Sequence, residues 1–528
     1  MSKENTILVL PGRIAIEVHP GRNVFQTLAE SGISLNQACG GKGICGKCKV
    51  IFFGRMPPPS PLDEKTLSPD DIAQGVRLAC GIVPIGGEVI ELLTLSPVRN
   101  KLEIATDRFP VHHWPGTKRG QVVLAVDLGT TNIVGLMLDP FEGLVIGSAE
   151  VSNGQAAFGA DVMTRLAYAS EGGVEARKRL KAIAFSDLEN LCSLLGIRKG
   201  DVAHVIAVMN SAMETFLLSW NPDSLGRYPC EPEFRKAVHM ELSMPKPLSG
   251  AKLHIPPVVG GYVGSDTVAA LQCILAAKAT PPFLLIDIGT NAESLLVSDH
   301  RMVACSSASG PAFEGGSISC GMRACDGAIE EVLLVDGQPV ARVIGEQPAK
   351  GIAGSGLFSL LGELVKHGGV DAFGMLQEKR LSPRLVRQGL NGKEVELAPR
   401  VSVSEGDIQQ FILAKASARA GLEVLLETAG LKPDDLTNIF LCGTFAGRLR
   451  VDDVLALGLV PEIEPSKIVT EGNAAAKGAA IIGCSSKAFQ HACALAKRIR
   501  HLRLSGNPMF SQIFQEHIGF ENLGRTMT

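Results

Sequence analysis

The sequence predicts a multidomain α/β protein, and three observations support this fold class. The chain has 528 residues, of which 45% are hydrophobic and 20% charged, so it can form several domains with buried cores. A cysteine-rich segment lies near the N-terminus, and a strand ending in an Asp-x-Gly-Thr turn occurs twice, at Asp127 and at Asp287. After the first turn, apolar strands alternate with amphipathic helices, as in α/β domains.

Composition and charge exclude several classes of protein. The net charge is −3 and the basic residues are spread along the chain, so nothing indicates a nucleic-acid or anionic-membrane partner. The N-terminus lacks the apolar stretch of a signal peptide, and no apolar run reaches the length of about 18 residues expected of a membrane span. The 13 cysteines, an odd number, favour a reducing compartment over a disulfide framework. We therefore expect a cytoplasmic protein.

Four cysteines in the first unit, residues 1–95, have the spacing of a metal cluster site. Cys39, Cys45, Cys48 and Cys80 follow a C-x5-C-x2-C pattern with a gap of 31 residues before the last. Four thiolates in this order can give two sulfurs to each iron of a [2Fe–2S] cluster, and the glycines of the loop let backbone N–H groups point at the sulfurs. A structural zinc site is the alternative, but such sites usually pair two short knuckles. The pattern therefore favours the [2Fe–2S] cluster.

The elements around these cysteines predict a small α/β domain. Strand-like runs at residues 7–10 and 14–18 are separated by the turn signal Pro11-Gly12, a short helix is expected at 24–31, and a strand at 48–53. The cysteine spacing resembles that of adrenodoxin-like ferredoxins, which implies a β-grasp fold, and the order of elements fits it.

Residues 96–120 contain several prolines and few apolar runs, and they are predicted to form a linker. His112 and His113 lie within it. Because no other ligand-type residue is close to them in sequence, we expect both histidines to face solvent rather than bind a metal.

Residues 121–485 are predicted to form one domain in two related halves. The sequence Val126-Asp-Leu-Gly-Thr-Thr-Asn132 recurs as Ile286-Asp-Ile-Gly-Thr-Asn291, and each copy follows a buried-strand run. The clearest helix runs from about 405 to 428, with Ser404 and Asp407 as a capping box and Gly430 near its end. Residues 486–528 are expected to form a helical C-terminal tail.

The repeated turn suits a nucleotide phosphate. Its glycine lets the backbone approach a phosphate, its hydroxyl and amide groups can donate hydrogen bonds, and its aspartate can hold a hydrated Mg²⁺. Two further Gly-rich turns follow in the second half, and no Walker A motif is present, which excludes a P-loop protein. The candidate ATP ligands are Gly129, Thr130, Thr131, Asn132, Gly289, Thr290, Asn291, Gly354, Ser355, Gly356, Gly443 and Thr444, and the candidate magnesium ligands are Asp127 and Asp287.

This order of turns resembles the acetate kinase, sugar kinase, Hsp70 and actin superfamily over most of residues 121–485. The resemblance implies a duplicated ribonuclease-H-like ATPase, in which the two Asp-Gly turns clamp the phosphates and the last glycine turn holds the adenosine. Residues 264–270 look like the connecting helix of Hsp70-type ATPases, so Asp266 is the candidate for orienting the attacking water. A plain helix N-cap is the alternative role for Asp266.

A [2Fe–2S] ferredoxin joined to an actin-like ATPase resembles the reductive activators of corrinoid-dependent enzymes. Further stretches carry this resemblance along the chain, at residues 210–213, 225–229, 257–264, 309–316 and 318–324. It implies ATP-dependent transfer of one electron from the cluster to Co(II) of a partner corrinoid protein, which restores the methyl-accepting Co(I). It also implies an upstream low-potential electron donor, and a homodimer for which the residues themselves give no support. The linker is short for this family, and Ala292 replaces an expected glycine in the second turn.

Other functions are weighed against this one. A [2Fe–2S] redox-sensing regulator that binds ATP is the least excluded, and an activator of another low-potential enzyme is a further alternative. A kinase would need a substrate pocket and no iron. Activators of 2-hydroxyacyl-CoA dehydratases share the ATPase fold but lack an N-terminal ferredoxin. Cys320 and Cys325 could form a second cluster or a redox pair, although no two further ligands lie nearby in sequence. The remaining helical cysteines are expected to be small core residues: Cys192, Cys273, Cys484 and Cys493.

Overall fold

The structure is a computed structural model that describes residues 5–10, 14–31, 33, 35, 41–43, 46–92, 108–159, 161–381, 385–389 and 391–520. The predicted turn at Pro11-Gly12 and two of the four cluster cysteines, Cys39 and Cys45, lie outside these residues. Among the described residues, no helix has the length and apolar character that a membrane span requires.

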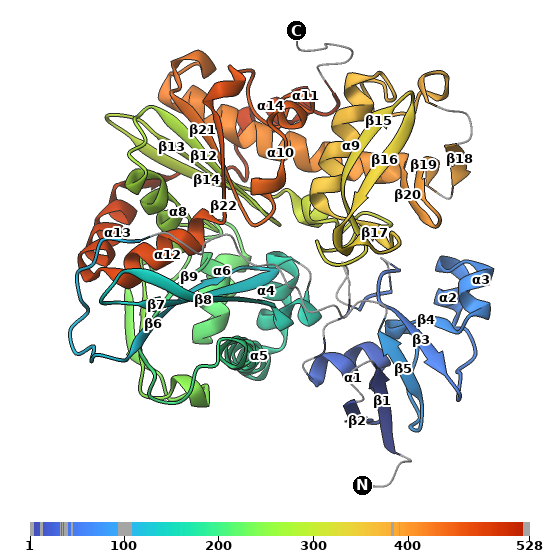
Figure 1. The fold of residues 1–528 in the computed structure, drawn as a ribbon, viewed down its shortest axis with the longest axis horizontal. Helices are drawn as coiled ribbons and strands as arrows, with labels where there is room; N and C mark the ends of the chain where they lie inside the picture. The colour runs from blue at the N-terminus through green and yellow to red at the C-terminus, as the bar shows by residue number, and fades with distance from the viewer. Residues whose placement is uncertain are drawn as a thin grey trace.

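The N-terminal domain is a mixed five-stranded sheet with one helix against it, and it confirms the β-grasp prediction (Figure 1). The outer strands run antiparallel to their neighbours, whereas β1 and β5 are parallel at the centre. Two short helices occupy the stretch between β3 and β4. The elements are β1 (Thr6–Leu10), β2 (Ile14–Glu17), α1 (Val24–Glu30), β3 (Lys49–Phe53), α2 (Pro61–Thr66), α3 (Pro69–Ala73), β4 (Val76–Leu78) and β5 (Val89–Leu92), in the sheet order β2-β1-β5-β3-β4.

The first lobe of the second domain is built on a six-stranded sheet. Its strand β6 runs antiparallel to β7 and parallel to β9, so the first Asp-x-Gly-Thr turn lies at the carboxyl end of a central strand. The strands are β6 (Val122–Leu128), β7 (Asn132–Asp139), β8 (Leu144–Ser152), β9 (Val202–Val208), β10 (Val238–Glu241) and β11 (Lys252–Ile255), and the helices are α4 (Val162–Glu171), α5 (Gly173–Leu194), α6 (Ser211–Leu218) and α7 (Asp223–Gly226).

The second lobe repeats this arrangement. Strand β12 runs antiparallel to β13 and parallel to β21, as β6 does with its own neighbours, which confirms the predicted duplication. The sheet order is β22-β21-β12-β13-β14-β23. Its strands are β12 (Phe283–Ile288), β13 (Ala292–Val297), β14 (Met302–Ser307), β21 (Asn438–Cys442), β22 (Ile468–Gly472) and β23 (Ile499–His501).

Two helices, α8 (Ser265–Ala276) and α12 (Ala474–Cys484), lie between the lobes and share one hydrophobic core with both sheets. They approach one another closely, because a Cβ atom placed on Gly478 would lie 1.9 Å from the carbonyl oxygen of Ala269. A glycine is therefore required at this crossing.

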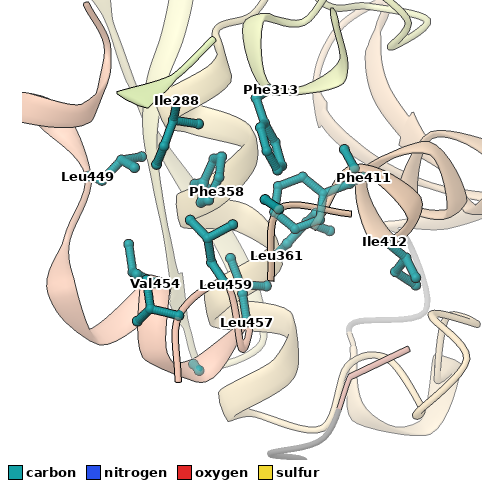
Figure 2. Packing of buried hydrophobic residues seen from close by; sticks show 14 of the residues in the cluster. Ile288, Phe313, Phe358, Leu361, Phe411, Ile412, Leu449, Val454, Leu457 and Leu459 are labelled. Carbon is teal, nitrogen blue, oxygen red and sulfur yellow. The ribbon is translucent and has the colours of Figure 1, made fainter. Parts of the chain in front are cut away.

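Insertions in the second lobe add two small sheets and two long helices around the largest core. Phe313, Phe358 and Phe411 pack together there with Leu361 (Figure 2). Helix α10 confirms the predicted helix and its capping box at Ser404. The elements are β15 (Ala328–Val335), β16 (Gln338–Val343), β17 (Gly351–Ile352), α9 (Gly354–Lys366), β18 (Val386–Gly389), β19 (Gly392–Ala398), β20 (Val401–Ser404), α10 (Glu405–Ala429) and α11 (Val451–Ala456).

Both predicted boundaries of the ATPase domain differ from the structure. Residues 96–107 of the predicted linker 96–120 lie outside the described residues. In the described part, Trp114 is buried, donates a hydrogen bond to the carbonyl of Ile482 at 3.3 Å and packs on Phe489, so it belongs to the core that both sheets share. His112 and His113 beside it are exposed, as predicted.

The expected C-terminal tail is also integrated. It contains α13 (Ser486–Arg498), β23 and α14 (Pro508–Glu516), and β23 pairs in parallel with β14 at the edge of the second sheet. The predicted domain boundary at residue 485 is therefore wrong. The sequence did not reveal this, because a three-residue strand held by backbone pairing leaves no visible pattern.

Candidate functional site

The two described cluster cysteines lie side by side. Cys48 precedes β3 and Cys80 follows β4, and these neighbouring antiparallel strands bring their Sγ atoms within 3.3 Å of one another. The N–H of Ala79 donates to the carbonyl of Cys48 at 2.8 Å and fixes this register. Two sulfurs on one tetrahedral metal with bonds of about 2.3 Å lie roughly 3.8 Å apart. The pair therefore fits two ligands of a single iron.

The glycines of the cluster loop are required by conformation and by space. Gly41, Gly43 and Gly46 have φ angles of 78°, 73° and 66°, in the left-handed region. A Cβ atom on Gly46 would also lie 2.5 Å from Thr66 Cγ2, and one on Gly41 would lie 2.6 Å from the ring of Phe25. The loop can thus pass close to the domain surface only with glycine at these positions.

A cleft between the two lobes contains nearly all the predicted nucleotide ligands. It has a volume of about 1290 Å³, including its open mouth, and it is reached by all four glycine turns. The predicted residues that line it are Asp127, Gly129, Thr130, Thr131, Asn132, Asp266, Asp287, Gly289, Thr290, Asn291, Gly354, Ser355, Gly443 and Thr444.

Gly356 is the exception among the candidates. It lies inside α9, where a Cβ atom would be 2.3 Å from the carbonyl oxygen of Ile329, so it allows close packing of the helix on β15 rather than contact with a ligand. Of the predicted ligand-binding turn Gly354-Ser355-Gly356, only the first two residues line the cleft.

The two Asp-x-Gly-Thr turns face one another across the cleft. The hydroxyl oxygens of Thr131 and Thr290 lie 3.1 Å apart, although they come from different lobes. Both contact one carboxylate oxygen of Glu314, at 2.7 Å and 3.1 Å respectively. The turns are thus arranged to hold one anionic group between them.

The later turns also leave polar groups available to a ligand. Ser355 is buried at the start of α9, and its hydroxyl has no hydrogen-bond partner among the described residues. Gly443 has a φ of 117°, and a Cβ atom there would lie 2.5 Å from the carbonyl oxygen of Ile288. An unpaired buried hydroxyl costs free energy unless a ligand or water satisfies it. The cleft therefore fits a polar ligand at Ser355.

Three aspartates converge at the base of the cleft. Burial raises the pKa of Asp127 to about 6, although Asn473 Nδ2 donates to its carboxylate at 2.9 Å. Burial and the charge of Asp127 raise the pKa of Asp266 to about 7, and burial with both neighbouring charges raises the pKa of Asp287 to about 8. Carboxylates this close disfavour joint ionisation unless a cation is present.

The alternative role of Asp266 as a helix N-cap is wrong. The N-cap of α8 is Gly264, and Asp266 is the second helical residue, with its carboxylate accepting from the N–H of Thr267 at 2.7 Å. A Cβ atom on Gly264 would lie 2.0 Å from the carbonyl of Met209, so the glycine lets the start of α8 approach β9. This approach places Asp266 in the cleft.

Several cleft residues were not singled out individually from the sequence. Asn210 Nδ2 donates to Thr130 Oγ1 at 3.1 Å, and the fully buried Arg165 donates to the Thr130 carbonyl at 2.7 Å. Some of these residues lie in the stretches that carried the family resemblance, so the resemblance could have identified them. Asn473 lies outside those stretches, at a strand-to-helix junction, and no comparable signal marks it in the sequence. The other unforeseen lining residues include Glu150, Glu293, Glu314, Arg323 and Arg448.

The remaining cysteines do not gather into a metal site in the part of the chain that the structure describes. Cys320 Sγ lies 3.6 Å from the carbonyl of Arg400, and burial raises the pKa of the Cys320 and Cys325 thiols. Of the four helical cysteines predicted to be core residues, three are buried: Cys192, Cys273 and Cys484. The fourth, Cys493, is half-buried.

The ferredoxin-like domain contacts both lobes. Glu30 on α1 forms an ion pair with Arg179 on α5 at 3.0 Å. On the second lobe, Lys47 Nζ donates to the carbonyl of Gly315 at 2.7 Å. Lys47 immediately precedes Cys48, so the second contact joins the cluster site to the residue after Glu314.

Comparison with protein families divides the chain into three matched regions. Residues 8–84 match the 2Fe-2S iron-sulfur cluster binding domain. Residues 122–277 match the RACo middle region, and residues 282–527 match the C-terminal domain of RACo, described as the ASKHA domain. Together, the last two regions cover both six-stranded sheets of the two-lobed domain, including the segment after 485.

Individual relatives agree with this division. The chain is 27% identical to the corrinoid activation enzyme RamQ of Eubacterium limosum, over 96% of this chain and 97% of RamQ. It is 28% identical to the [Co(II) methylated amine-specific corrinoid protein] reductase of Methanosarcina barkeri, over 51% of this chain and 52% of that protein. The solved structure of a reductive activator for corrinoid, iron-sulfur protein is 26% identical, with a TM-score of 0.71 over 98% of both chains.

Proposed function

The chain belongs to the family of reductive activators of corrinoid proteins, and we propose that it uses ATP to drive one electron from a [2Fe–2S] cluster to Co(II) of a partner corrinoid protein. The observation that carries this proposal is the hydrogen bond from Lys47 to Gly315, which joins the ferredoxin-like domain to the residue next to Glu314 in the lining of the cleft between the lobes. The full-length similarity to RamQ supports it. The product is Co(I), the state that accepts a methyl group.

The magnitude of the electron-transfer step explains why a nucleotide is useful. Plant-type clusters have potentials of about −400 mV, and the Co(II)/Co(I) couple is expected to lie lower. For one electron, a gap of roughly 100–150 mV corresponds to about 2–3.5 kcal/mol. This cost is close to the ~1–3 kcal/mol typical of coupling between two binding sites. Nucleotide binding and hydrolysis can therefore supply it without phosphorylation of a substrate.

We propose that the cleft binds ATP together with Mg²⁺. Acidic residues outnumber basic ones in its lining, and a bare polyphosphate would be repelled by them. No three metal-ligand side chains among the described residues are close enough to hold a metal by themselves. Mg²⁺ would thus be held by phosphate oxygens and waters, with Asp127 and Asp287 as the carboxylates nearest to it. Asp266 is proposed to orient the attacking water.

We propose that Cys39, Cys45, Cys48 and Cys80 hold the cluster, which supplies a one-electron carrier when bound. Anaerobic reconstitution should give about two irons and two sulfides per chain, with an EPR signal after reduction. Zinc in place of iron would contradict the assignment. A separate low-potential donor must reduce the cluster, and the odd number of cysteines, 13, favours a reducing, cytoplasmic location.

The decisive experiment mixes the reduced protein with candidate Co(II) corrinoid proteins, with and without Mg·ATP, and follows the Co(I) absorbance band. We expect Co(I) to form at a useful rate only with the nucleotide. Equal formation without nucleotide would mean that the ATPase has another task. Phosphorylation of a small molecule, with no corrinoid reduced, would favour a kinase.

A further inference from the structure

A short path of bonded groups connects the nucleotide cleft with the cluster loop. At one end, Glu314 Oε2 accepts hydrogen bonds from the hydroxyls of Thr131 and Thr290 at 2.7 Å and 3.1 Å. At the other end, the carbonyl of the next residue, Gly315, accepts from Lys47 Nζ at 2.7 Å. Adjacent residues therefore contact the phosphate turns on one side and the ferredoxin-like domain on the other.

The turn that carries these two contacts is tightly packed. Gly315 ends the 3-10 helix Gly310–Glu314 with a φ of 74°, and its N–H donates to the carbonyl of Ala312 at 3.0 Å. A Cβ atom on Gly321 would lie 2.1 Å from the Gly315 carbonyl oxygen, so this oxygen has little room to move on its own. A shift of the Glu314 backbone would therefore be passed to the carbonyl that holds Lys47.

A nucleotide phosphate and the Glu314 carboxylate require the same donors. Both groups are anionic acceptors, and the hydroxyls of Thr131 and Thr290 lie only 3.1 Å apart. Each hydroxyl has a single proton to donate. A phosphate within hydrogen-bond distance of both hydroxyls would lie against the Glu314 carboxylate, and two anions in contact repel strongly where water is excluded. Occupation of the two turns by phosphate therefore requires the Glu314 carboxylate to leave.

We propose that Glu314 and Lys47 are positioning residues that make nucleotide binding and docking of the cluster loop on the second lobe mutually exclusive. The proposal rests on the proposed function, since it needs a nucleotide in this cleft. Without nucleotide, Lys47 holds the segment next to Cys48 against Gly315. Mg·ATP displaces Glu314 and its turn, Lys47 is released, and this face of the cluster domain becomes available to the corrinoid protein.

The second contact between the domains explains why release at Lys47 would not detach the ferredoxin-like domain. Glu30 pairs with Arg179 of the first lobe at 3.0 Å and with Arg22 of its own helix region at 3.2 Å. These ion pairs involve neither the second lobe nor the phosphate turns. The cluster domain would therefore turn about this contact when the nucleotide arrives.

The first test compares Lys47→Met with Lys49→Met in the full-length, cluster-loaded protein. Lys49 lies on the other side of Cys48, and its ammonium pairs with Asp71 inside the same domain at 3.1 Å, so it controls for the loss of charge. Binding of Mg·AMPPNP is measured by calorimetry. By reciprocity of coupled sites, Lys47→Met should bind it about fivefold more tightly than the wild type, near the lower end of typical coupling, and Lys49→Met should bind like the wild type.

The second test follows hydrogen exchange of residues 46–53 with and without Mg·AMPPNP. Exchange should rise on nucleotide binding in the wild type and in Lys49→Met, and it should already be high and unresponsive in Lys47→Met. Glu314→Gln should also bind the nucleotide more tightly, because a neutral amide repels phosphate less. If the wild type binds nucleotide but residues 46–53 do not respond and the two lysine variants agree, the inference is overturned. If the wild type binds no nucleotide, the proposed function fails instead.

Discussion

The two Asp-x-Gly-Thr turns share one backbone arrangement but differ in what surrounds them. The first turn is supported by donors: Asn210 donates to the Thr130 hydroxyl, Arg165 to the Thr130 carbonyl and Asn473 to the Asp127 carboxylate, at 3.1, 2.7 and 2.9 Å. All three donors are buried or nearly so. The first turn is therefore held rigidly before any ligand arrives.

The second turn is surrounded by acids. Asp287 lies opposite Glu293 in the paired strands. Burial and, after it, the charges of Asp266, Asp127 and Glu314 raise the pKa of Asp287 to about 8, against about 6 for Asp127. The hydroxyl of Ser309, 3.3 Å from the Thr290 carbonyl, is a weaker support. The two turns therefore differ in their surroundings: buried donors hold the first turn, whereas acidic side chains gather around the second.

The largest expected effect comes from Asp127→Ala. Removal of this carboxylate would take away its proposed electrostatic contact with the magnesium nucleotide, and we expect ATP turnover to fall about 10²–10³-fold. The visible spectrum of the cluster is the control and should not change, because Asp127 lies in the other domain. Loss of the cluster in this variant would show that the two domains do not fold separately.

A comparable loss is expected for Asp266→Asn, which keeps the size of the side chain. If Asp266 orients the attacking water, turnover should fall about 10²-fold, while Mg·AMPPNP still binds. Steady-state phosphate release and calorimetry measure the two quantities. A variant with normal turnover would remove Asp266 from the chemistry and leave it as a residue that shapes the start of α8.

The charge difference between the turns predicts a pH dependence. Because the pKa values of Asp127 and Asp287 are raised to about 6 and about 8, the folded nucleotide-free protein binds more protons than the unfolded chain between about pH 4 and 8. Its stability from these groups should fall as the pH rises through this window.

Magnesium nucleotide should reverse that trend, because it favours the ionised carboxylates. Binding should release protons near about pH 7, and the stabilisation by nucleotide should grow with pH. Calorimetric titrations in buffers of different ionisation enthalpy count the released protons. Binding without proton release would mean that the acids are already ionised in the free protein.

The smallest expected effect on nucleotide binding comes from removing the side chains that donate hydrogen bonds to each of the two turns. Asn210→Ala removes a buried donor from the first turn and should weaken nucleotide binding by about 1 kcal/mol, or roughly fivefold. Ser309→Ala removes a longer contact from the second turn and should change binding less. Equal losses in the two variants would contradict the view that the first turn is the more rigidly supported.

Local features of this fold could be predicted from the sequence. Each predicted phosphate turn is a contiguous motif at the end of a buried strand. The helix that begins at Glu405 is bounded by a capping box at its start and by the left-handed Gly430 at its end, and both signals lie in residues next to the helix. The cysteine spacing likewise identified a cluster domain whose β-grasp sheet is present. Such signals depend on short-range backbone preferences, which the sequence displays directly.

Features that depend on long-range contacts could not be predicted in this way. Glu314 reaches the threonines of both lobes, and Asn473 reaches Asp127, only because the lobes face one another. Gly356 looks like a ligand-binding glycine in sequence, but helix packing explains it. Trp114 and strand β23 extend the ATPase domain beyond both predicted boundaries through tertiary contacts that no local pattern records.

The crossing of α8 and α12 at Gly478 limits how one lobe can move against the other. The two helices touch through backbone atoms at this point, since no side chain separates Gly478 from Ala269, and both helices begin at the cleft with Asp266 and Asn473. This backbone contact favours rotation of one lobe against the other about the crossing over separation of the lobes, and the displacement in a rotation grows with distance from its axis. The N-terminal domain lies on the other side of the molecule from this crossing (Figure 1), so a small rotation there would displace that domain most.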